Sequence, residues 1–297
     1  MKDERDNSRA PTPTLAQGAL SLALAPAAGG AVAGFACRGR PVLRAPAAGA
    51  RHADQLACFP LVPFSNRVRD GVFCYRGREI RLPPNHFDPH PLHGDGWQAV
   101  WQVSEASATV AGLAYEHAGR AGWPWPYRAE QSFTLEPRGL AARLVLRNLA
   151  AEPFPAGLGF HPYFPRAGAR LTTDLDGVWL SDATRIPTEW VELPAHWNFS
   201  RGLALAGLDI DHCFTGWSGE AILSWPYGSC RITAPPPLDK LVIYVPPGED
   251  FFCIEPVSNV NDGFNLRSRG VPATGVRDLA PGEAFAVEMR LLLEGAW

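Results

Sequence analysis

The sequence lacks long apolar runs and a strong excess of either charge. No stretch of about eighteen uninterrupted apolar residues occurs, which argues against a membrane-spanning helix. The formal net charge is -3, so charge gives no reason to expect nucleic acid or an anionic membrane surface as a partner. Hydrophobic residues make up 46% and charged residues 19%, which is typical of a globular protein. A small neutral ligand is the better expectation.

Close cysteine pairs are also missing. The six cysteines are widely spaced, and no two of them form a C-x-x-C pair: Cys37, Cys58, Cys74, Cys213, Cys230 and Cys253. This spacing argues against a thiol zinc site, a redox motif and a disulfide scaffold. We expect free thiols that are buried as small core residues.

The N-terminal segment lacks the positive charge of a secretory signal. MKDERDNSR carries as many acidic as basic residues, and Pro26 and the Gly29-Gly30 pair interrupt the apolar stretch that follows. We therefore expect a cytoplasmic protein. Residues 1–13 are polar and contain two prolines, which predicts a flexible tail, and residues 14–297 are expected to form one domain.

Proline and glycine number 29 each and interrupt the chain every few residues, which leaves little room for long helices. Between them apolar and polar residues alternate with a period of two in six runs: 20–24, 130–136, 141–147, 220–225, 240–245 and 284–294. Short alternating runs separated by turn signals predict an all-β protein, either an antiparallel sandwich or a barrel.

The stretch HFDPHPLHGDGW, residues 86–97, concentrates histidine and aspartate. Imidazole and carboxylate groups at such short intervals are able to bind zinc or iron. The same groups are suited to hydrogen bonds with a sugar, or they belong to a polar loop without a function. The stretch alone leaves these three interpretations open.

Three further clusters contain candidate residues. In PFSNRVRDGVF, Asn66 and Arg67 precede a glycine turn, and the guanidinium is either a solvated charge or a ligand-binding group. In GLGFHPYFPR, aromatic and proline neighbours surround His161, which is either a satisfied core histidine or a general acid or base. In FFCIEPV, the proline should end strand pairing and place Glu255 at a strand end, where the carboxyl group either points outward or lies in a pocket in which desolvation raises its pKa. Asp211 in LDIDHCF is a candidate of the same kind.

These segments, in this order, resemble the aldose 1-epimerases, or mutarotases. The resemblance covers about residues 19–294 and rests on NRVRDGVFCYRG, PLHGDGWQAVWQV, GFHPYF, DHCF, IEPVSNVNDGFN and a closing L-x-PGE-x-F-x-V-x-M strand. The opening LSLALAPAAGGAVAGF is similar to the family's first strands. The resemblance implies a large antiparallel β-sandwich with a sugar-binding cleft on one sheet. It implies a free aldose as the partner, no metal and no organic cofactor, and no motif indicates an oligomeric state.

By the same resemblance, His161 exchanges a proton with the ring oxygen of the sugar, and Glu255 exchanges one with the anomeric hydroxyl. The positions that match or adjoin sugar-contacting residues are His93, Arg67 and Asp211, with Asn66 next to the arginine and Tyr163 as a wall residue. Opening a cyclic hemiacetal needs a base at O1 and an acid at the ring oxygen. We therefore expect Glu255 to begin as a carboxylate and His161 as an imidazolium with a raised pKa.

The sequence departs from the better-studied galactose mutarotases after GFHPYF, where Pro165 and Arg166 replace the usual Asn-Leu pair. The segment GWPWPYRAEQSF resembles a bacterial subgroup whose substrates are less settled, and Trp123 and Trp125 either stack on a sugar or cover the sheet.

A non-catalytic carbohydrate-binding protein is one alternative. Another is a hexose-6-phosphate 1-epimerase, with phosphate ligands drawn from Arg67, Arg69, Arg128 and Arg166.

Within HFDPHPLHGDGW, only His93 matches a position that the family uses. His86, Asp88 and His90 precede it in a proline-containing loop, for which we expect a solvated polar turn. On this interpretation the stretch contains one substrate ligand beside a loop, and the metal site becomes the weakest of its three interpretations.

Overall fold

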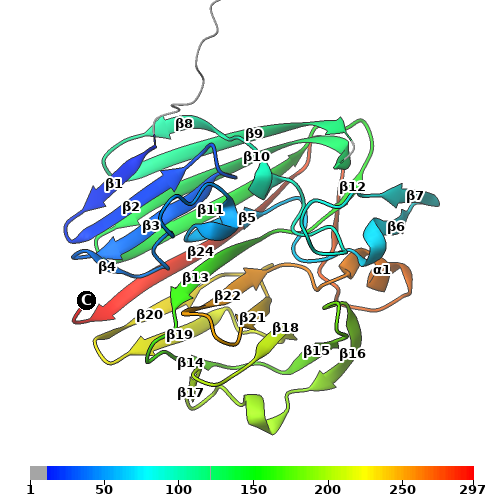
Figure 1. Ribbon diagram of the computed structural model, residues 1–297. Coiled ribbons are helices and arrows are strands. Elements are labelled where there is room, and N and C mark those ends of the chain that lie inside the picture. Colours follow the sequence, from blue (N-terminus) through cyan, green and yellow to red (C-terminus); the bar gives the residue numbers. More distant parts are fainter. Residues whose placement is uncertain (1–11, 121) are drawn as a thin grey trace, which may run out of the picture.

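The computed structural model describes residues 12–120 and 122–297, in which strands predominate (Figure 1). The predicted tail, residues 1–13, lies almost entirely outside the described residues. Within the described ranges the one α-helix is α1 (Gly263–Ser268), and no helix there is long and apolar enough to span a membrane. The all-β prediction is therefore confirmed, and two large antiparallel sheets form the sandwich.

The first sheet has eleven strands. Ten of them lie in the order β1 (Thr14–Gln17), β2 (Leu20–Ala25), β3 (Ala31–Cys37), β5 (Cys58–Leu61), β13 (Gly159–Pro165), β22 (Phe251–Val257), β21 (Lys240–Val245), β18 (Ile210–Thr215), β15 (Gly177–Ser181) and β16 (Pro187–Glu192). The eleventh strand, β4 (Arg40–Pro41), pairs with β3.

The second sheet has nine strands. Their order is β17 (Leu203–Ala204), β14 (Arg170–Thr173), β19 (Glu220–Trp225), β20 (Gly228–Thr233), β24 (Ala284–Gly295), β11 (Gly139–Asn148), β10 (Trp123–Glu136), β9 (Val110–Arg120) and β8 (Gln102–Ala106). Two small pairs complete the fold: β6 (Val72–Tyr75) with β7 (Arg78–Arg81), and β12 (Phe154–Ala156) with β23 (Arg277–Leu279). Figure 1 shows β6, β7 and α1 together at one end of the two layers. Single 3-10 turns are η1 (Ala53–Gln55), η2 (Arg69–Gly71), η3 (Gly96–Gln98) and η4 (Ala195–Trp197).

Strand alternation builds the core between the sheets. Each of the six alternating runs falls within a strand, so these predictions are confirmed. In β21, Leu241 and Ile243 point into the intersheet core, whereas Val242 joins a second apolar cluster on the outer face of the eleven-stranded sheet. Trp123 and Trp125 are 0% and 2% exposed in the intersheet core, so they cover the sheet and do not contact a ligand.

The cysteines are free thiols, as expected. Five of them are buried, and Cys74 on β6 is the exposed exception. Cys213 and Cys253 lie in the outer-face cluster of the eleven-stranded sheet, so two thiols share the face that carries the cavity described below.

The packing of the intersheet core indicates how much free energy of unfolding is lost when a large side chain is removed. Phe164 on β13 is fully buried and stacks on Phe252 of β22 with ring centroids 5.7 Å apart. Phe164→Ala should lower the free energy of unfolding by about 3 to 5 kcal/mol, because it removes buried apolar surface and leaves a cavity. Urea unfolding measures this change. Leu149→Ala, at a side chain that is 47% exposed, is the control and should stay within about 0.5 kcal/mol of the wild type.

Candidate active site

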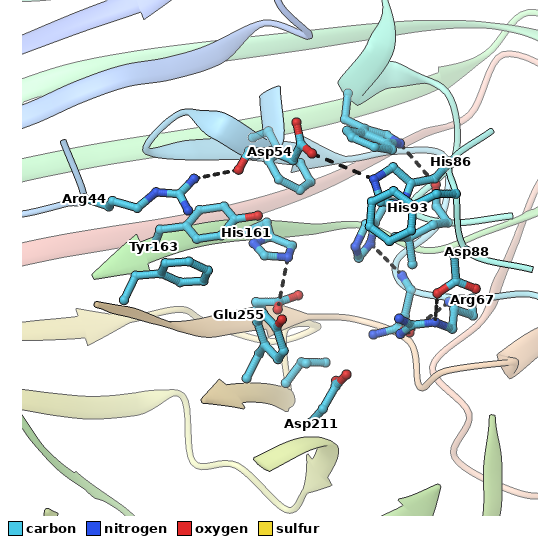
Figure 2. A pocket seen from close by; sticks show the side chains of 18 residues that line it. Arg44, Asp54, Arg67, His86, Asp88, His93, His161, Tyr163, Asp211 and Glu255 are labelled. Atoms are coloured by element: carbon cyan, nitrogen blue, oxygen red, sulfur yellow. Dashed lines mark hydrogen bonds and ion pairs between the residues drawn. The ribbon is translucent and has the colours of Figure 1, made fainter. Parts of the chain in front are cut away.

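A cavity of about 340 Å³ opens on the outer face of the eleven-stranded sheet (Figure 2). All seven residues singled out from the sequence line it, together with aromatic and acidic neighbours. The complete lining is Arg44, Asp54, Phe59, Asn66, Arg67, His86, Phe87, Asp88, Leu92, His93, Trp97, His161, Tyr163, Asp211, Val242, Tyr244, Phe251 and Glu255. The structure thus brings together side chains that are up to 211 positions apart in the sequence, from Arg44 to Glu255.

Four adjacent strands supply the floor of the cavity. His161 and Tyr163 are two residues apart on β13 and therefore share a face, and Glu255 lies across from His161 on β22 because Tyr163 pairs with Cys253 and Gly159 with Val257. Asp211 on β18 lies farther along the same face. The alternation that sends neighbouring residues into the core therefore sends these polar groups outward.

The expectation that Glu255 ends its strand is wrong. Strand β22 continues to Val257, and Pro256 pairs with Leu241 of β21. On the other side, the pairing with β13 is interrupted between Tyr163–Cys253 and Gly159–Val257. The missing N–H group of Pro256 falls in this interrupted stretch, so the proline is tolerated inside the sheet.

His161 and Glu255 form the central contact of the cavity. Nε2 of His161 lies 3.3 Å from Oε1 of Glu255, and the side chains are 8% and 3% exposed. Nδ1 of His161 and Oε2 of Glu255 are buried and have no hydrogen-bond partner. His161 is therefore not a core histidine whose ring nitrogens are both satisfied, and an unpartnered carboxylate oxygen remains beside it.

Burial sets the protonation of this pair. It lowers the pKa of His161 to about 3, with the positive charges of Arg44 and Arg67 adding to the effect. It raises the pKa of Glu255 well above its usual range, and the negative charge of Asp211 raises it further. The expected imidazolium with a raised pKa is thus wrong for the unliganded site: the imidazole is neutral and the carboxyl group holds the proton. Both the neutral pair and the pair of carboxylate and imidazolium carry one proton in total.

Aromatic rings fix the orientation of the imidazole. Phe59 stacks on His161 with centroids 4.4 Å apart and planes at 25°, and Tyr163 stacks on it at 4.7 Å and 26°. The guanidinium of Arg44 lies 3.7 Å from the centroid of the Tyr163 ring and donates hydrogen bonds to the backbone carbonyls of Asp54 and Leu56. These contacts leave the imidazole little freedom to turn away from Glu255.

His93 is held as a hydrogen-bond donor to the cavity. The backbone N–H of Asn66 donates to Nδ1 of His93 at 3.0 Å, and the backbone N–H of His93 donates to the carbonyl of Asn66 at 3.0 Å. Burial and the charges of His161 and Arg67 hold the pKa of His93 well below its usual range. Because Nδ1 accepts a bond in a neutral ring, we infer that the proton is on Nε2.

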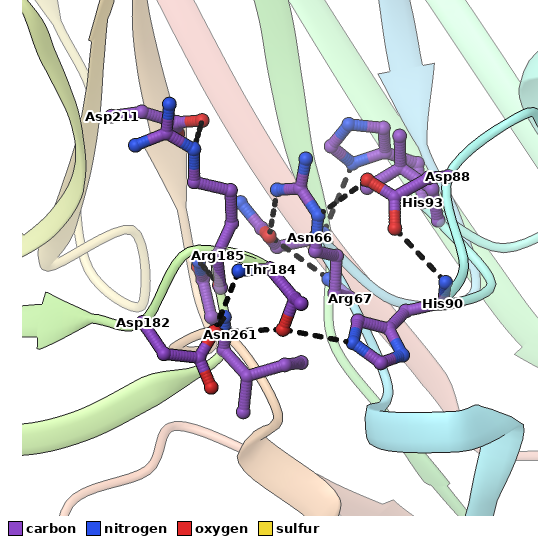
Figure 3. A network of polar contacts seen from close by, with 12 residues as sticks. Asn66, Arg67, Asp88, His90, His93, Asp182, Thr184, Arg185, Asp211 and Asn261 are labelled. Carbon is purple, nitrogen blue, oxygen red and sulfur yellow. Dashed lines mark hydrogen bonds and ion pairs between the residues drawn. The ribbon is translucent and has the colours of Figure 1, made fainter.

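Arg67 is a partly buried, anchored cation and not a solvated edge charge. Its Nε lies 2.8 Å from Oδ2 of Asp88, and Oδ1 of Asp88 accepts the backbone N–H of His90 at 2.9 Å (Figure 3). His90 is 5% exposed; its Nδ1 accepts the N–H of Asp70, and its Nε2 lies 3.2 Å from Oγ1 of Thr184. The expected solvated turn at residues 86–90 is therefore wrong for Asp88 and His90, since the loop folds inward to hold Arg67.

Arg185 is a residue of the site that the sequence did not reveal. Its Nε lies 3.3 Å from Oδ2 of Asp211, and burial raises the pKa of Asp211 in spite of the nearby Arg67 and Arg185 charges (Figure 3). Arg185 lies within a turn in which Oδ1 of Asp182 accepts the backbone N–H groups of Thr184 and Ile186. The only local signal is this aspartate turn, which does not reveal contact with a strand 26 residues later.

Asp95 anchors the loop that carries His93, and it was also missed. It accepts hydrogen bonds from the hydroxyls of Tyr115 at 2.8 Å and Tyr127 at 2.5 Å, and its Oδ2 lies 2.6 Å from Nδ1 of His117. Burial alone would raise the pKa of Asp95, but these three partners outweigh it and hold the pKa below its usual range. Strands β9 and β10 of the second sheet thus fix the His93 loop.

A glycine allows this loop to pass close to strand β5. Gly94 has φ +69°, and a Cβ on it would lie 2.3 Å from the carbonyl oxygen of Val62. The loop therefore requires glycine next to His93, and Trp97 at its end packs on Phe59 with ring centroids 5.4 Å apart.

The histidine-rich stretch does not assemble a metal site. Asp88 and His90 bond to the partners described above, and Nε2 of His86 lies 3.8 Å from Oδ2 of Asp54 at the cavity wall. Within residues 12–120 and 122–297, the group of three donors close enough to hold a cation is His161, Cys253 and Glu255. The metal interpretation of residues 86–97 is therefore not supported.

Comparison with known proteins decides the family. The sequence profile described as aldose 1-epimerase matches residues 11–292. The chain belongs to the aldose 1-epimerase family. The uncharacterized protein YphB of Escherichia coli (strain K12) is 36% identical over 293 residues, which cover 95% of this chain and 98% of that protein.

Solved structures of this family have the same fold. A protein from Escherichia coli K12 that carries the provisional name aldose 1-epimerase superposes with a TM-score of 0.88 at 34% identity, covering 96% of this chain and 99% of its own. A galactose 1-epimerase from Lactobacillus acidophilus NCFM superposes with a TM-score of 0.79 at 17% identity, covering 100% of this chain and 98% of its own. The second comparison establishes the fold alone.

The Asp95 network predicts a pH-dependent contribution to stability. Asp95→Asn should lower the free energy of unfolding at pH 7 by about 2 to 4 kcal/mol, because it weakens three buried hydrogen bonds to a charged group. A carboxyl group whose folded pKa is depressed stabilises the protein above its unfolded pKa, and this contribution is lost as pH falls through the folded pKa. The difference between wild type and variant should therefore shrink below about pH 4.

Urea unfolding at several pH values measures this dependence. Asp174→Asn, at an exposed aspartate between β14 and β15, is the matched control and should change stability little at any pH. A difference that stayed constant from pH 7 down to pH 3 would contradict the assigned role of the Asp95 charge.

Proposed function

We propose that this protein is an aldose 1-epimerase that interconverts the α and β anomers of a free aldose. The observation that carries the proposal is the 3.3 Å contact between His161 and Glu255 inside a cavity of about 340 Å³. A cyclic hemiacetal opens when one group removes the O1 proton and another protonates the ring oxygen, so an acid and a base must stand together at the sugar. This pair satisfies that requirement without a metal or an organic cofactor.

The proton of the pair moves in a closed cycle. It first crosses from Glu255 to His161, which gives the carboxylate and the imidazolium. Glu255 then takes the O1 proton while His161 protonates the ring oxygen, and the bond from C1 to the ring oxygen breaks to give the aldehyde. Both groups are now neutral, which is the form that burial favours, so the buried site stabilises the opened sugar relative to the charged pair. Rotation about C1–C2 and the reverse steps close the ring as the other anomer.

Three polar groups support the sugar around this pair. His93 presents an Nε2–H donor, Arg67 presents guanidinium N–H groups that Asp88 does not engage, and Asp211 presents carboxylate oxygens. Asn66 orients His93 through the backbone, and Tyr163 forms an aromatic wall beside His161. Donors and acceptors at fixed positions over an aromatic surface suit the hydroxyl groups of a pyranose.

The charge of the lining favours an uncharged sugar over a hexose 6-phosphate. Four carboxyl groups and two arginines line the cavity: Asp54, Asp88, Asp211 and Glu255 against Arg44 and Arg67. Of the other arginines considered for phosphate, Arg69 lies 4.0 Å from Asp182 and Asp262, and Arg128 pairs with glutamates of the other sheet. Arg166 donates to the backbone carbonyls of Pro246, Leu205 and Leu208. No cluster of free cations is therefore built into the described part of this cavity.

We further propose that the protein acts in the cytoplasm and that residues 14–297 form one domain. All six cysteines are free, and reduced thiols are typical of cytoplasmic proteins.

Loss of either member of the pair should abolish activity. His161→Ala and Glu255→Gln should each reduce the enzyme-dependent decay of optical rotation of fresh α-D-glucose or α-D-galactose by about 10² to 10⁴-fold, because each removes one proton transfer. His196→Ala and Glu189→Gln, at exposed positions outside the cavity, are matched controls that should keep full activity.

Three results would contradict the proposal. Retained activity in either variant of the pair would remove the assigned roles. Tight sugar binding without faster mutarotation in the wild type would indicate a carbohydrate-binding protein. A higher kcat/KM for glucose 6-phosphate than for glucose would indicate the phosphorylated substrate class.

The pKa values of the pair predict the pH profile. The pair holds one proton between the lowered pKa of His161, about 3, and the raised pKa of Glu255. As pH falls, a second proton binds to the pair only near the pKa of His161, about 3. We therefore expect kcat/KM, corrected for spontaneous mutarotation, to show no acid limb near the usual histidine pKa of 6.5. An acid limb centred near pH 6.5 would contradict the neutral resting form.

A further inference from the structure

A thiol that the proposed mechanism does not use lies beside the acid–base pair. Cys253 is two residues from Glu255 on β22, so both side chains point to the outer face of the sheet, and Tyr163 is its partner across β13. Nε2 or Nδ1 of His161, Sγ of Cys253 and a carboxylate oxygen of Glu255 all lie within 4.8 Å of one another, and all three residues are buried. Nitrogen, thiolate and carboxylate are the three ligand types of protein zinc sites.

The spacing of these donors is close to that of a tetrahedral zinc site. Zinc bonds of about 2.0 to 2.3 Å place neighbouring ligand atoms about 3.3 to 3.6 Å apart. The separation of 3.3 Å between His161 Nε2 and Glu255 Oε1 already has this value. The sulfur is at most 4.8 Å from the other two donors, so an approach of at most about 1.3 Å completes the triangle.

The surroundings favour a cation at this position. Oε2 of Glu255 is buried without a hydrogen-bond partner, so a ligand atom is available that no described residue satisfies. His161 and Glu255 line the cavity, which leaves the fourth coordination position open to water. Zinc sites with three protein ligands and one open position are well known, and zinc enzymes use them.

We propose that His161, Cys253 and Glu255 form a binding site for a soft divalent cation such as Zn²⁺, and that the bound cation inhibits the enzyme. On binding, the S–H bond of Cys253 and the O–H bond of Glu255 release their protons to water while metal–sulfur and metal–oxygen bonds form, and no electron is transferred. The cation then occupies the ring nitrogen and the carboxylate that ring opening requires. The cation and the sugar therefore compete for the same position in the cavity. The inhibition rests on the proposed function, but the binding of the cation does not.

Cobalt provides a test of binding that does not depend on activity. Co²⁺ titrated into the chelator-treated full-length protein should bind with one equivalent and give the near-ultraviolet absorption of a thiolate–cobalt bond, and Zn²⁺ should displace it. Cys253→Ala should lose this absorption and bind Co²⁺ at least tenfold more weakly. Cys213→Ala, at a buried cysteine on the same face of the sheet, is the matched control and should keep it. Cys253→Ser, which preserves the size of the side chain, should lose the absorption as Cys253→Ala does.

Mutarotation assays with Zn²⁺ then test inhibition. Zn²⁺ should inhibit the wild type and Cys213→Ala equally, whereas Cys253→Ala should need at least tenfold more Zn²⁺ for the same inhibition. Absence of the thiolate absorption in the wild type, or its persistence in both Cys253 variants, would overturn the site. If no variant and no wild-type protein accelerated mutarotation, the proposed function would fail, and the cobalt spectra would still decide the cation site.

Discussion

The site depends on one buried proton held between His161 and Glu255. The two groups lie 3.3 Å apart and are almost inaccessible to water, so forming a charge on both of them costs free energy of desolvation. Burial therefore favours the neutral imidazole and the neutral carboxyl group. Moving the proton from Glu255 to His161 does not change the net charge of the pair. For this reason the same low-polarity environment tolerates both the neutral pair and the pair of carboxylate and imidazolium. The aromatic rings and the sheet keep the distance short enough for that exchange.

Polar groups around the pair are arranged so that each contacts a further polar group that fixes its position. Asp88 holds Arg67, Asn66 holds His93, and Arg185 faces Asp211. Groups held in this way lose little rotational freedom when a sugar binds, which preserves more of the binding free energy. Asp95 extends this support to the second sheet, so the position of the His93 loop depends on the packing of the whole sandwich.

The period-two pattern was enough to predict six of the strands. In 284–294, for example, Phe285, Val287, Met289 and Leu291 alternate with Ala286, Glu288 and Arg290, and the structure places the first set in the intersheet core. The seven site residues required the family resemblance, because spacing alone left His161 and Arg67 ambiguous. Contacts between distant segments were not predictable: the pairing of Arg185 with Asp211 and the inward fold of Asp88 and His90 depend on tertiary structure. The error at Pro256 has the same origin, since only the sheet reveals which side of β22 lacks pairing.

The features that suit the pair to proton transfer also make it a place for a cation. Removing the imidazole from water keeps its nitrogen unprotonated, and an unprotonated nitrogen is both a base and a metal ligand. The carboxyl groups around the cavity, which disfavour an anionic sugar, attract a divalent ion for the same electrostatic reason. Whether such an ion is held firmly then depends on a third donor, and the alternation of β22 places the sulfur of Cys253 next to Glu255 on the same face. The proposed preference for an uncharged sugar and the proposed sensitivity to cations thus have one physical cause, the charge and burial of the cavity lining.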